Sequence, residues 1–498
     1  MAPAALPQDP DLGQLRNQAR ELQRAVRSDD PTARKRVAKW HPAPPASDRL
    51  PLTAAQLVLA REHGFASWAR LRHYVEVVTA RAWTPGKPAP AKESPADQFL
   101  RLACLTYGDD EPADRAAAAE LLAQHPQLPQ QDLFVAAACA DVLSVRRHLN
   151  GRPAGAAVTG GPHGWSPLLY QAYARAEVKI ERAATLKTAR LLLDAGADPN
   201  DGRFWHGLPT PFTVLTGVLG GGEQSRPEHP HALAFARLLL EAGADPNDGQ
   251  AIYNRMFGTN DDHLVLLFEY GLGLDTHGPW HCLLGESLES PTDMLRALLA
   301  WAITHDQRDR VALLAEHGVD VVSRFAEERS PTRYTPIELA LLNGHRKLAD
   351  QLRALGARPP RLRPADSFVA AVLAADADAV RHTPPKVVAD VRRERTGLVT
   401  WAAAEGAPGA VELLVEAGFD VNAVGRSDIF ANDPWHTALH VAAEKGDLDL
   451  ARTLLGLGAD PNLRDERYKA TPLGWARYFD QPLLVELLEP LTADDGPT

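Results

Sequence analysis

The chain has 498 residues, a formal net charge of −11 and a hydrophobic fraction of 45%, which are ordinary values for a soluble folded protein. It contains no apolar run long enough to span a membrane, and the first ten residues lack the basic start and apolar core of a secretory signal. The 3 cysteines are too few and too far apart for a disulfide framework or a CxxC metal site. Arginine makes up 43 of the 53 basic residues, and Ala and Pro are abundant, so we expect a cytoplasmic protein from a GC-rich bacterium.

The N-terminal part of the chain differs from the rest in charge. The first 95 residues hold 15 Lys and Arg against 9 Asp and Glu, whereas the remainder holds 38 against 55. Asp30-Pro31 is typical of a helix cap and first turn, Gly64 would end a helix over Thr53–His63, and Ser67 would cap the next one. We therefore predict a basic helical module. Its first helix should carry a stripe formed by Leu12, Leu15, Ala19, Leu22 and Val26.

Repeated segments occupy most of the remaining chain. Ala189–Gly202 reads ARLLLDAGADPNDG, and Ala236–Gly249 differs from it at only 1 of 14 positions. A third copy covers Ala451–Asn462, and a looser one covers Val411–Asn422. Such self-similarity is typical of repeat architectures, in which each unit buries its apolar face only by stacking on its neighbours.

The residues before each copy also repeat, and they predict a pair of short helices. Thr437 of TALHVAAEKG can cap a first helix that Gly446 ends. A second helix follows, and Gly458 sits where a left-handed C-terminal glycine belongs. The apolar stripe of the second helix comprises Leu450, Leu454 and Leu455. The spacing of 21 residues from Thr437 to Gly458 recurs between Thr335 and Gly356, and between Gly397 and Gly418.

These motifs resemble ankyrin repeats. The resemblance is most specific for the units that begin at Thr335, Gly397, Thr437 and Thr471. It implies an all-α, helix-turn-helix solenoid with short hairpin tips, the loops that precede the first helix of each unit. The segment Ala55–Glu76 is similar to a helical module found ahead of ankyrin repeats in many bacterial proteins, and that similarity implies no known activity.

The resemblance also gives a domain organisation. We assign residues 1–82 to the basic helical module, 83–96 with 4 prolines to a linker, 97–491 to the repeat array and 492–498 to a tail. The array should hold about eleven units, several of them degenerate. The degenerate units are expected at Asp97–Leu128, Asp132–Asn150, Ala251–Asp275, Arg308–Val322 and Asp366–Arg381.

Signals for catalysis or metal binding are weak in this sequence. His277, His281 and Cys282 form an H-x-x-x-H-C cluster, but Gly278-Pro279 interrupts any helix there and no fourth ligand is evident. His440 occupies the helix-start motif, where a structural hydrogen bond is expected. His229 and His231 are expected to be solvated in a Gly/Pro-rich loop. We expect no enzyme activity, no cofactor and no metal. An enzyme with an unrecognised pocket remains an alternative.

Nucleic acid is another class of partner to weigh. Arg34, Lys35, Arg36 and Lys39 form a basic run that could contact phosphates, and this suggests a regulator whose N-terminal module binds nucleic acid. The alternative is a solvated face or attraction to the acidic repeats. We favour this alternative over nucleic-acid binding, because the repeat region carries a net charge of −17 and would repel a polyanion.

The ankyrin resemblance implies a protein-binding module or scaffold, whose unidentified partner docks on a concave face made by tips and first helices. Aromatic and arginine side chains, the residue types most often found as binding hot spots, occur in the tips of this sequence. We expect the helix-end positions Glu444 and Lys445 to lie beside them. The candidate binding residues are Trp205, His206, Arg426, Phe430, Trp435, Glu444, Lys445 and Tyr468.

Overall fold

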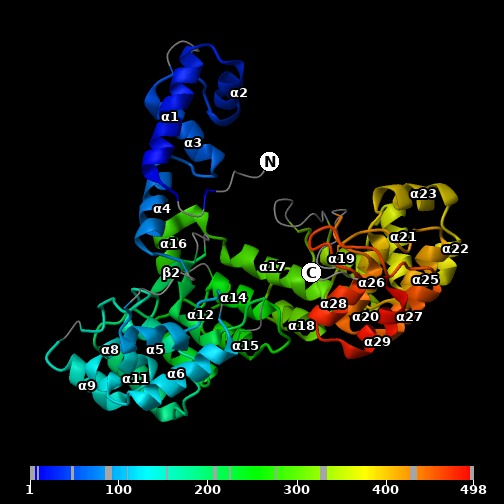
Figure 1. Cartoon of the computed structure of the whole chain (residues 1–498). Helices are drawn as coiled ribbons and strands as arrows, with labels where there is room; N and C mark the ends of the chain where they lie inside the picture. The colour runs from blue at the N-terminus through cyan, green and yellow to red at the C-terminus, as the bar shows by residue number, and fades with distance from the viewer. Residues whose placement is uncertain are drawn as a thin grey trace. The chain divides into compact units, whose positions relative to one another are not determined.

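A computed structural model describes residues 6–7, 10–45, 50–84, 92–108, 110–152, 155–205, 210–223, 226–274, 278–325, 334–426 and 434–493. The chain divides into two compact units, unit 1 at residues 1–298 and unit 2 at residues 299–498, and each is described by itself. Both consist mostly of helices, which agrees with the predicted all-α class (Figure 1). Within the described residues, no helix is both long enough and apolar enough to cross a membrane.

The predicted N-terminal helices are present in unit 1. They are α1 (Leu12–Arg27), α2 (Pro31–Trp40), α3 (Leu52–Glu62) and α4 (Trp68–Ala80). The side chains of Asp11, Asp30 and Ser67 cap α1, α2 and α4 by accepting backbone N–H bonds. Their shared core also includes Phe204 and Trp280, so the module packs directly onto the repeat part of unit 1.

The start of the predicted linker is structured. Trp83 belongs to strand β1 (Ala82–Trp83), which pairs in parallel with β2 (Gly202–Trp205), and β2 pairs antiparallel with β3 (Phe212–Thr213). The Trp83 ring is buried and packs edge-on against Trp165 at 4.9 Å. The prediction that the linker begins at residue 83 was wrong at this position, because an aromatic side chain is buried there. Residues 85–91 of the predicted linker lie outside the described residues.

Unit 1 continues as two rows of helices. The first helices of successive pairs pack in the order α5 (Pro95–Ala103), α8 (Leu133–Ala138), α10 (Pro167–Tyr173), α12 (Val214–Leu219) and α14 (Gly249–Met256). The second helices are α6 (Pro112–Gln124), α9 (Val142–Leu149), α11 (Arg182–Asp194), α13 (Ala232–Glu241) and α15 (Asp262–Glu269). The remaining helical segments are α7 (Leu128–Gln131), α16 (Pro279–Leu284), the 3₁₀ turn Gly285–Ser287 and α17 (Pro291–Thr304), within which the division between the units falls.

Unit 2 repeats this arrangement, and its yellow-to-red helices lie side by side in Figure 1. First helices are α19 (Pro336–Leu342), α21 (Pro364–Leu373), α24 (Leu398–Ala404), α26 (Ala438–Lys445) and α28 (Pro472–Tyr478). Second helices are α18 (Arg308–Glu316), α20 (Arg346–Ala354), α22 (Ala377–Arg381), α25 (Pro408–Glu416), α27 (Leu448–Gly456) and α29 (Pro482–Leu488). An additional helix, α23 (Pro385–Glu394), and the 3₁₀ turn Glu489–Leu491 complete the unit.

The Thr437 unit shows how the sequence motif builds one helix pair. The Thr437 and His440 side chains form a capping box at the start of α26, and Gly458 after α27 has a φ of 94°, as predicted. Leu454 is fully buried, whereas Leu455 is only half-buried. The buried stripe of α27 is therefore narrower than the sequence prediction.

Asparagine side chains of one unit form hydrogen bonds with the backbone of the next unit. Asn200 donates from Nδ2 to the Gly243 carbonyl at 2.9 Å and accepts the Asp245 N–H at 2.8 Å. Asn422 makes the same pair of bonds to Gly458 and Asp460 at 3.3 and 2.8 Å. Each asparagine closes one turn and holds the equivalent turn of the next unit, an arrangement that we call the asparagine ladder. Its other members are Asn247, bonded to Leu274 and Gly273, and Asn462, bonded to Ala493.

Candidate functional site

One hairpin tip of unit 2 is organised by a buried carboxylate. Asp465 is fully buried, and its Oδ1 accepts the backbone N–H groups of Arg467 at 2.8 Å and Tyr468 at 2.6 Å. Its Oδ2 accepts the Ala470 N–H at 3.0 Å and the Trp475 indole Nε1–H at 3.1 Å. Burial by itself raises the pKa of Asp465, but these donors outweigh it and the pKa is lowered. The carboxylate therefore fixes the tip to the first helix that follows it.

The tip presents an aromatic and cationic surface. The Arg467 guanidinium lies 4.0 Å from the centroid of the Trp435 ring, and the Arg426 guanidinium lies 5.7 Å from it. Trp435 is half-buried, with its ring 5.9 Å from Trp475, whereas Tyr468 is 70% exposed. We call Arg426, Trp435, Arg467 and Tyr468 the Trp435 cluster. The structure thus brings the predicted residues Arg426 and Trp435 together and adds Arg467, which Tyr468 follows directly in the chain.

Glu444 and Lys445 do not lie beside this cluster. They end α26, whereas Trp435 precedes its first turn, so a helix of 8 residues separates them. The Lys445 ammonium donates to the Ala404 carbonyl, and the Glu444 carbonyl accepts from Gln481 Nε2 at 3.4 Å. The expectation that these positions flank the tips was wrong, because first-helix ends and tips lie at opposite ends of the helix.

Trp205 belongs to unit 1 and is not a free tip residue. It ends strand β2, its Nε1 donates to the Thr106 carbonyl at 2.9 Å, and its ring lies 6.1 Å from that of Phe212. The strand pairing therefore turns its indole inward, toward the cavity described next. The predicted residues His206 and Phe430 lie outside the described residues.

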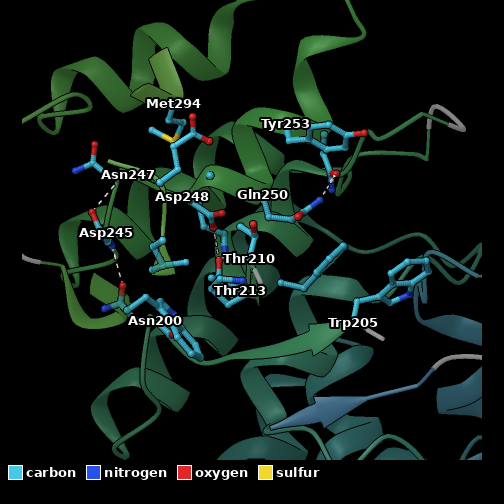
Figure 2. A pocket seen from close by; sticks show the side chains of 18 of the residues that line it. Asn200, Trp205, Thr210, Thr213, Asp245, Asn247, Asp248, Gln250, Tyr253 and Met294 are labelled. Carbon is cyan, nitrogen blue, oxygen red and sulfur yellow. Dashed lines mark hydrogen bonds between the residues drawn. The ribbon is translucent and has the colours of Figure 1, made fainter. Parts of the chain in front are cut away.

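Unit 1 contains a cavity of about 540 Å³ between the β2–β3 hairpin and helix α14, a size within the usual range of ligand sites. Figure 2 shows Trp205 and Tyr253 toward one end, Asp245 and Asn247 toward the other, and Gln250 between them. Aromatic side chains, amides and carboxylates all contribute to its wall. The aromatic lining residues are Tyr107, Trp205, Phe212, Tyr253 and Trp280.

Asp248 supports the wall of this cavity. It is buried, and its carboxylate accepts hydrogen bonds from the Thr213 hydroxyl, from the Thr216 hydroxyl at 3.1 Å and from the Ala251 N–H at 2.9 Å. Burial raises the pKa of Asp248, although these donors act in the opposite direction. The carboxylate thereby caps α14 and joins it to β3, which fixes the two walls relative to each other.

Two buried polar side chains lie against each other beneath the floor of the cavity. The Asn254 side chain is 3% exposed, and its hydrogen bond with the Tyr107 hydroxyl acts to lower the pKa of that phenol. Burial raises the pKa of Tyr107 to about 12. Gln250 lines the cavity, and its Nε2 donates to Asn254 Oδ1 at 2.8 Å. This bond leaves the Gln250 Oε1 as an acceptor. The wall therefore offers a polar ligand one amide oxygen here as a hydrogen-bond acceptor.

The histidines that we considered as ligands have structural surroundings. His440 shares a hydrogen bond of 2.8 Å with the Thr437 hydroxyl and donates from Nε2 to the Ala470 carbonyl at 3.1 Å, and burial lowers its pKa to about 4. His281 Nε2 donates to the Glu289 carbonyl at 3.0 Å. The expectation that His229 is solvated was wrong: it is 5% exposed against Phe235, and burial lowers its pKa to about 3. His277 lies outside the described residues.

Among the similarities that comparisons with known proteins find, two cover short stretches of this chain. One stretch of 98 residues is 37% identical to the serine/threonine-protein kinase VIK of Arabidopsis thaliana and covers 20% of this chain and 21% of that protein. A stretch of 80 residues is 45% identical to the E3 ubiquitin-protein ligase Ufd4 of Drosophila melanogaster and covers 16% of this chain and 3% of that protein. The chain thus spans only a small part of either relative.

A comparison with protein-family models identifies the repeats. The model described as ankyrin repeats (3 copies) matches residues 369–465 and 399–494. These ranges contain the Thr437 unit, the Asp465 tip and the last helix pairs of unit 2. Ankyrin repeats therefore occupy the C-terminal region of this chain.

Proposed function

We propose that this protein acts as a non-catalytic scaffold that binds a protein partner on the concave side of its C-terminal ankyrin repeats. Ankyrin repeats generally mediate protein–protein interaction, which supports the class of partner. The partner would contact the Trp435 cluster and the first helices next to it. The bacterial cytoplasm remains our proposal for its location.

The observation that carries this proposal is the exposed Tyr468 on a tip held in place from beneath. Asp465 fixes the backbone of Tyr468, while the side chain itself is 70% exposed, and the preceding residue, Arg467, contacts the Trp435 ring. Exposed tyrosine and arginine on a rigid frame lose little conformational entropy on binding. The tip therefore has the composition and the rigidity of a binding hot spot.

The basic residues of the N-terminal module support a protein-binding role over nucleic-acid binding. Arg36 forms a bidentate ion pair with Glu62, Arg34 pairs with Asp29, and Lys39 lies 4.5 Å from the Trp40 ring centroid. Part of the positive charge in the run is thus already engaged within the module. A phosphate backbone would have to compete with these contacts.

Tyr468 and Tyr478 provide a matched test. Tyr478 is 83% exposed but ends α28, whereas Tyr468 precedes its start. A photo-crosslinking residue at position 468 of the full-length chain should capture a protein in extracts of the native host, and the same residue at 478 should not. With the captured partner purified, Tyr468→Ala should weaken binding by more than about 1 kcal/mol, roughly fivefold, and Tyr478→Ala should leave it unchanged. Equal capture at both positions, or an unaffected affinity for Tyr468→Ala, would refute the proposed surface.

A further inference from the structure

We propose that the cavity of unit 1 binds a short extended segment of a protein that carries an arginine or lysine side chain, with the cationic group held beside Glu223 and Tyr253. This site is separate from the Trp435 cluster, which belongs to unit 2. The inference is therefore independent of the proposed function and can fail or succeed without it.

The charge of the cavity wall favours a cation. The described lining residues include four carboxylates, and the only arginine or lysine among them is Arg226. The Arg226 guanidinium is turned away from a ligand, because it donates to the Asp110 carbonyl and, at 2.8 Å, to the Gly108 carbonyl. The wall thus presents an excess of negative charge, which attracts cations and repels anions. The four carboxylates are those of Glu223, Asp245, Asp248 and Glu289.

The aromatic end of the cavity supplies a place for that cation. The Tyr253 hydroxyl donates to Glu223 Oε1 at 2.5 Å, and this bond holds the carboxylate next to the phenol ring. Tyr253 is 41% exposed, and Trp205 lies at the same end of the cavity in Figure 2. A guanidinium or ammonium group there could form an ion pair with Glu223 and lie over an aromatic face.

The same chemistry already occurs inside unit 1. The Arg81 guanidinium lies 5.1 Å from the centroid of Trp280, another aromatic residue of the wall, and 3.9 Å from the Asp201 carboxylate. A cation bound between an aromatic ring and a carboxylate is therefore compatible with this part of the fold.

The polar wall and the size of the cavity favour a peptide over a free cation. The Gln250 Oε1 in the cavity wall can accept a backbone N–H of such a segment. The cavity of about 540 Å³ also offers room for more than one side chain. An extended segment would place its peptide groups along the floor and its basic side chain at the aromatic end.

Capped pentapeptides of sequence Ala-Ala-Xaa-Ala-Ala test this inference by titration calorimetry with the full-length chain. With arginine or lysine at the central position, binding should be saturable and should weaken as salt is raised. With citrulline, which has the shape of arginine without its charge, affinity should fall by about tenfold, the change expected for a cation–π contact together with an ion pair. With glutamate, binding should be absent.

Two variants of the protein test whether the peptide binds in the cavity. Glu223→Gln removes the charge at an exposed position, so it should fold normally and weaken the arginine peptide about fivefold or more. Glu241→Gln, at an exposed glutamate on α13 that does not line the cavity, should leave the affinity unchanged. Equal affinity for the citrulline and arginine peptides, or for wild type and Glu223→Gln, would overturn the inference. Equal affinity for capped arginine alone and for the pentapeptide would show that the site takes a small cation instead of a peptide.

Discussion

Replacing Asp465 by Asn should open the tip that carries Tyr468. The carboxylate accepts four hydrogen bonds, two on each oxygen. An amide keeps only one of the two oxygens, so two bonds are lost and an NH₂ group faces two N–H donors. Hydrogen bonds to a charged group contribute about 1.5–3 kcal/mol each, so the loss should be about 3 kcal/mol or more. Because Asp465 is fully buried, solvent cannot replace the missing acceptors unless the loop opens.

Hydrogen exchange measured by mass spectrometry would detect this opening. Amides of residues 465–475 should exchange faster in Asp465→Asn than in wild type, and the partner should bind more weakly because Tyr468 is no longer held in place. Asp449→Asn is a suitable control, since Asp449 has a 97% exposed side chain on α27. Unchanged protection of residues 465–475 in Asp465→Asn would refute the argument that the carboxylate holds the tip.

Three further predictions concern the Thr437 unit. Leu454→Ala should lower the free energy of unfolding by about 2–5 kcal/mol and Leu455→Ala by less, because only Leu454 is fully buried. Similar urea midpoints for the two variants would contradict this difference. Gly458→Val should lower the free energy of unfolding by about 1–3 kcal/mol through backbone strain alone, since φ is 94° and an added Cβ meets no atom within 4 Å. Gly458→Asn should lower it by less. Equal denaturation midpoints for the two variants would show that strain is unimportant. The pKa of His440 is lowered from 6.5 to about 4, so protonation favours the unfolded state. Stability present above pH 6.5 should therefore be lost as the pH falls toward 4. If His440→Gln shows the same pH dependence of unfolding as wild type, His440 does not contribute to it.

The repeat units were predictable because their motifs are dense and local. Thr437 and Gly458 each have a role set by neighbours within one helix turn, so residue type and spacing suffice to assign a cap and a left-handed C-terminal glycine. The degenerate units at Asp132–Asn150 and Asp366–Arg381 were found in the same way, and each contains two short helices. Local periodicity thus gave the helix pairs and the fold class.

Contacts between distant residues were not predictable from such patterns. Trp83 pairs with Trp205, which is 122 positions away, through strands too short to show alternation. His229 follows a Gly/Pro-rich segment that suggests a solvated loop, but its N–H donates to the Val218 carbonyl at 3.0 Å and its ring packs against Phe235. In both places a buried aromatic contact overrides the local composition.

The cavity of unit 1 could not be located from the sequence for a related reason. Its lining comes from residues between Tyr107 and Met294, so several separate segments of the chain contribute to it. Glu223 and Tyr253 are ordinary surface residues by sequence, and their hydrogen bond exists only because the fold brings together positions 30 residues apart. Trp205 was identified as a candidate, but as an exposed tip residue instead of part of a cavity wall.

The asparagine ladder has a consequence for how this chain can change in length. The bonds from Asn200 to Gly243 and Asp245 join the turns that follow second helices, whereas the extra residues of this unit lie in the connection between α10 and α11 and in α11 itself. The interval from Ser166 to Asn200 is 34 residues and that from Thr437 to Asn462 is 25, yet both asparagines close the same kind of turn. Length variation is thereby separated from the contacts that set the spacing of the units. Loops of foreign sequence grafted between a first and a second helix should be accommodated, while a single deletion between a second helix and its asparagine should disrupt the stacking.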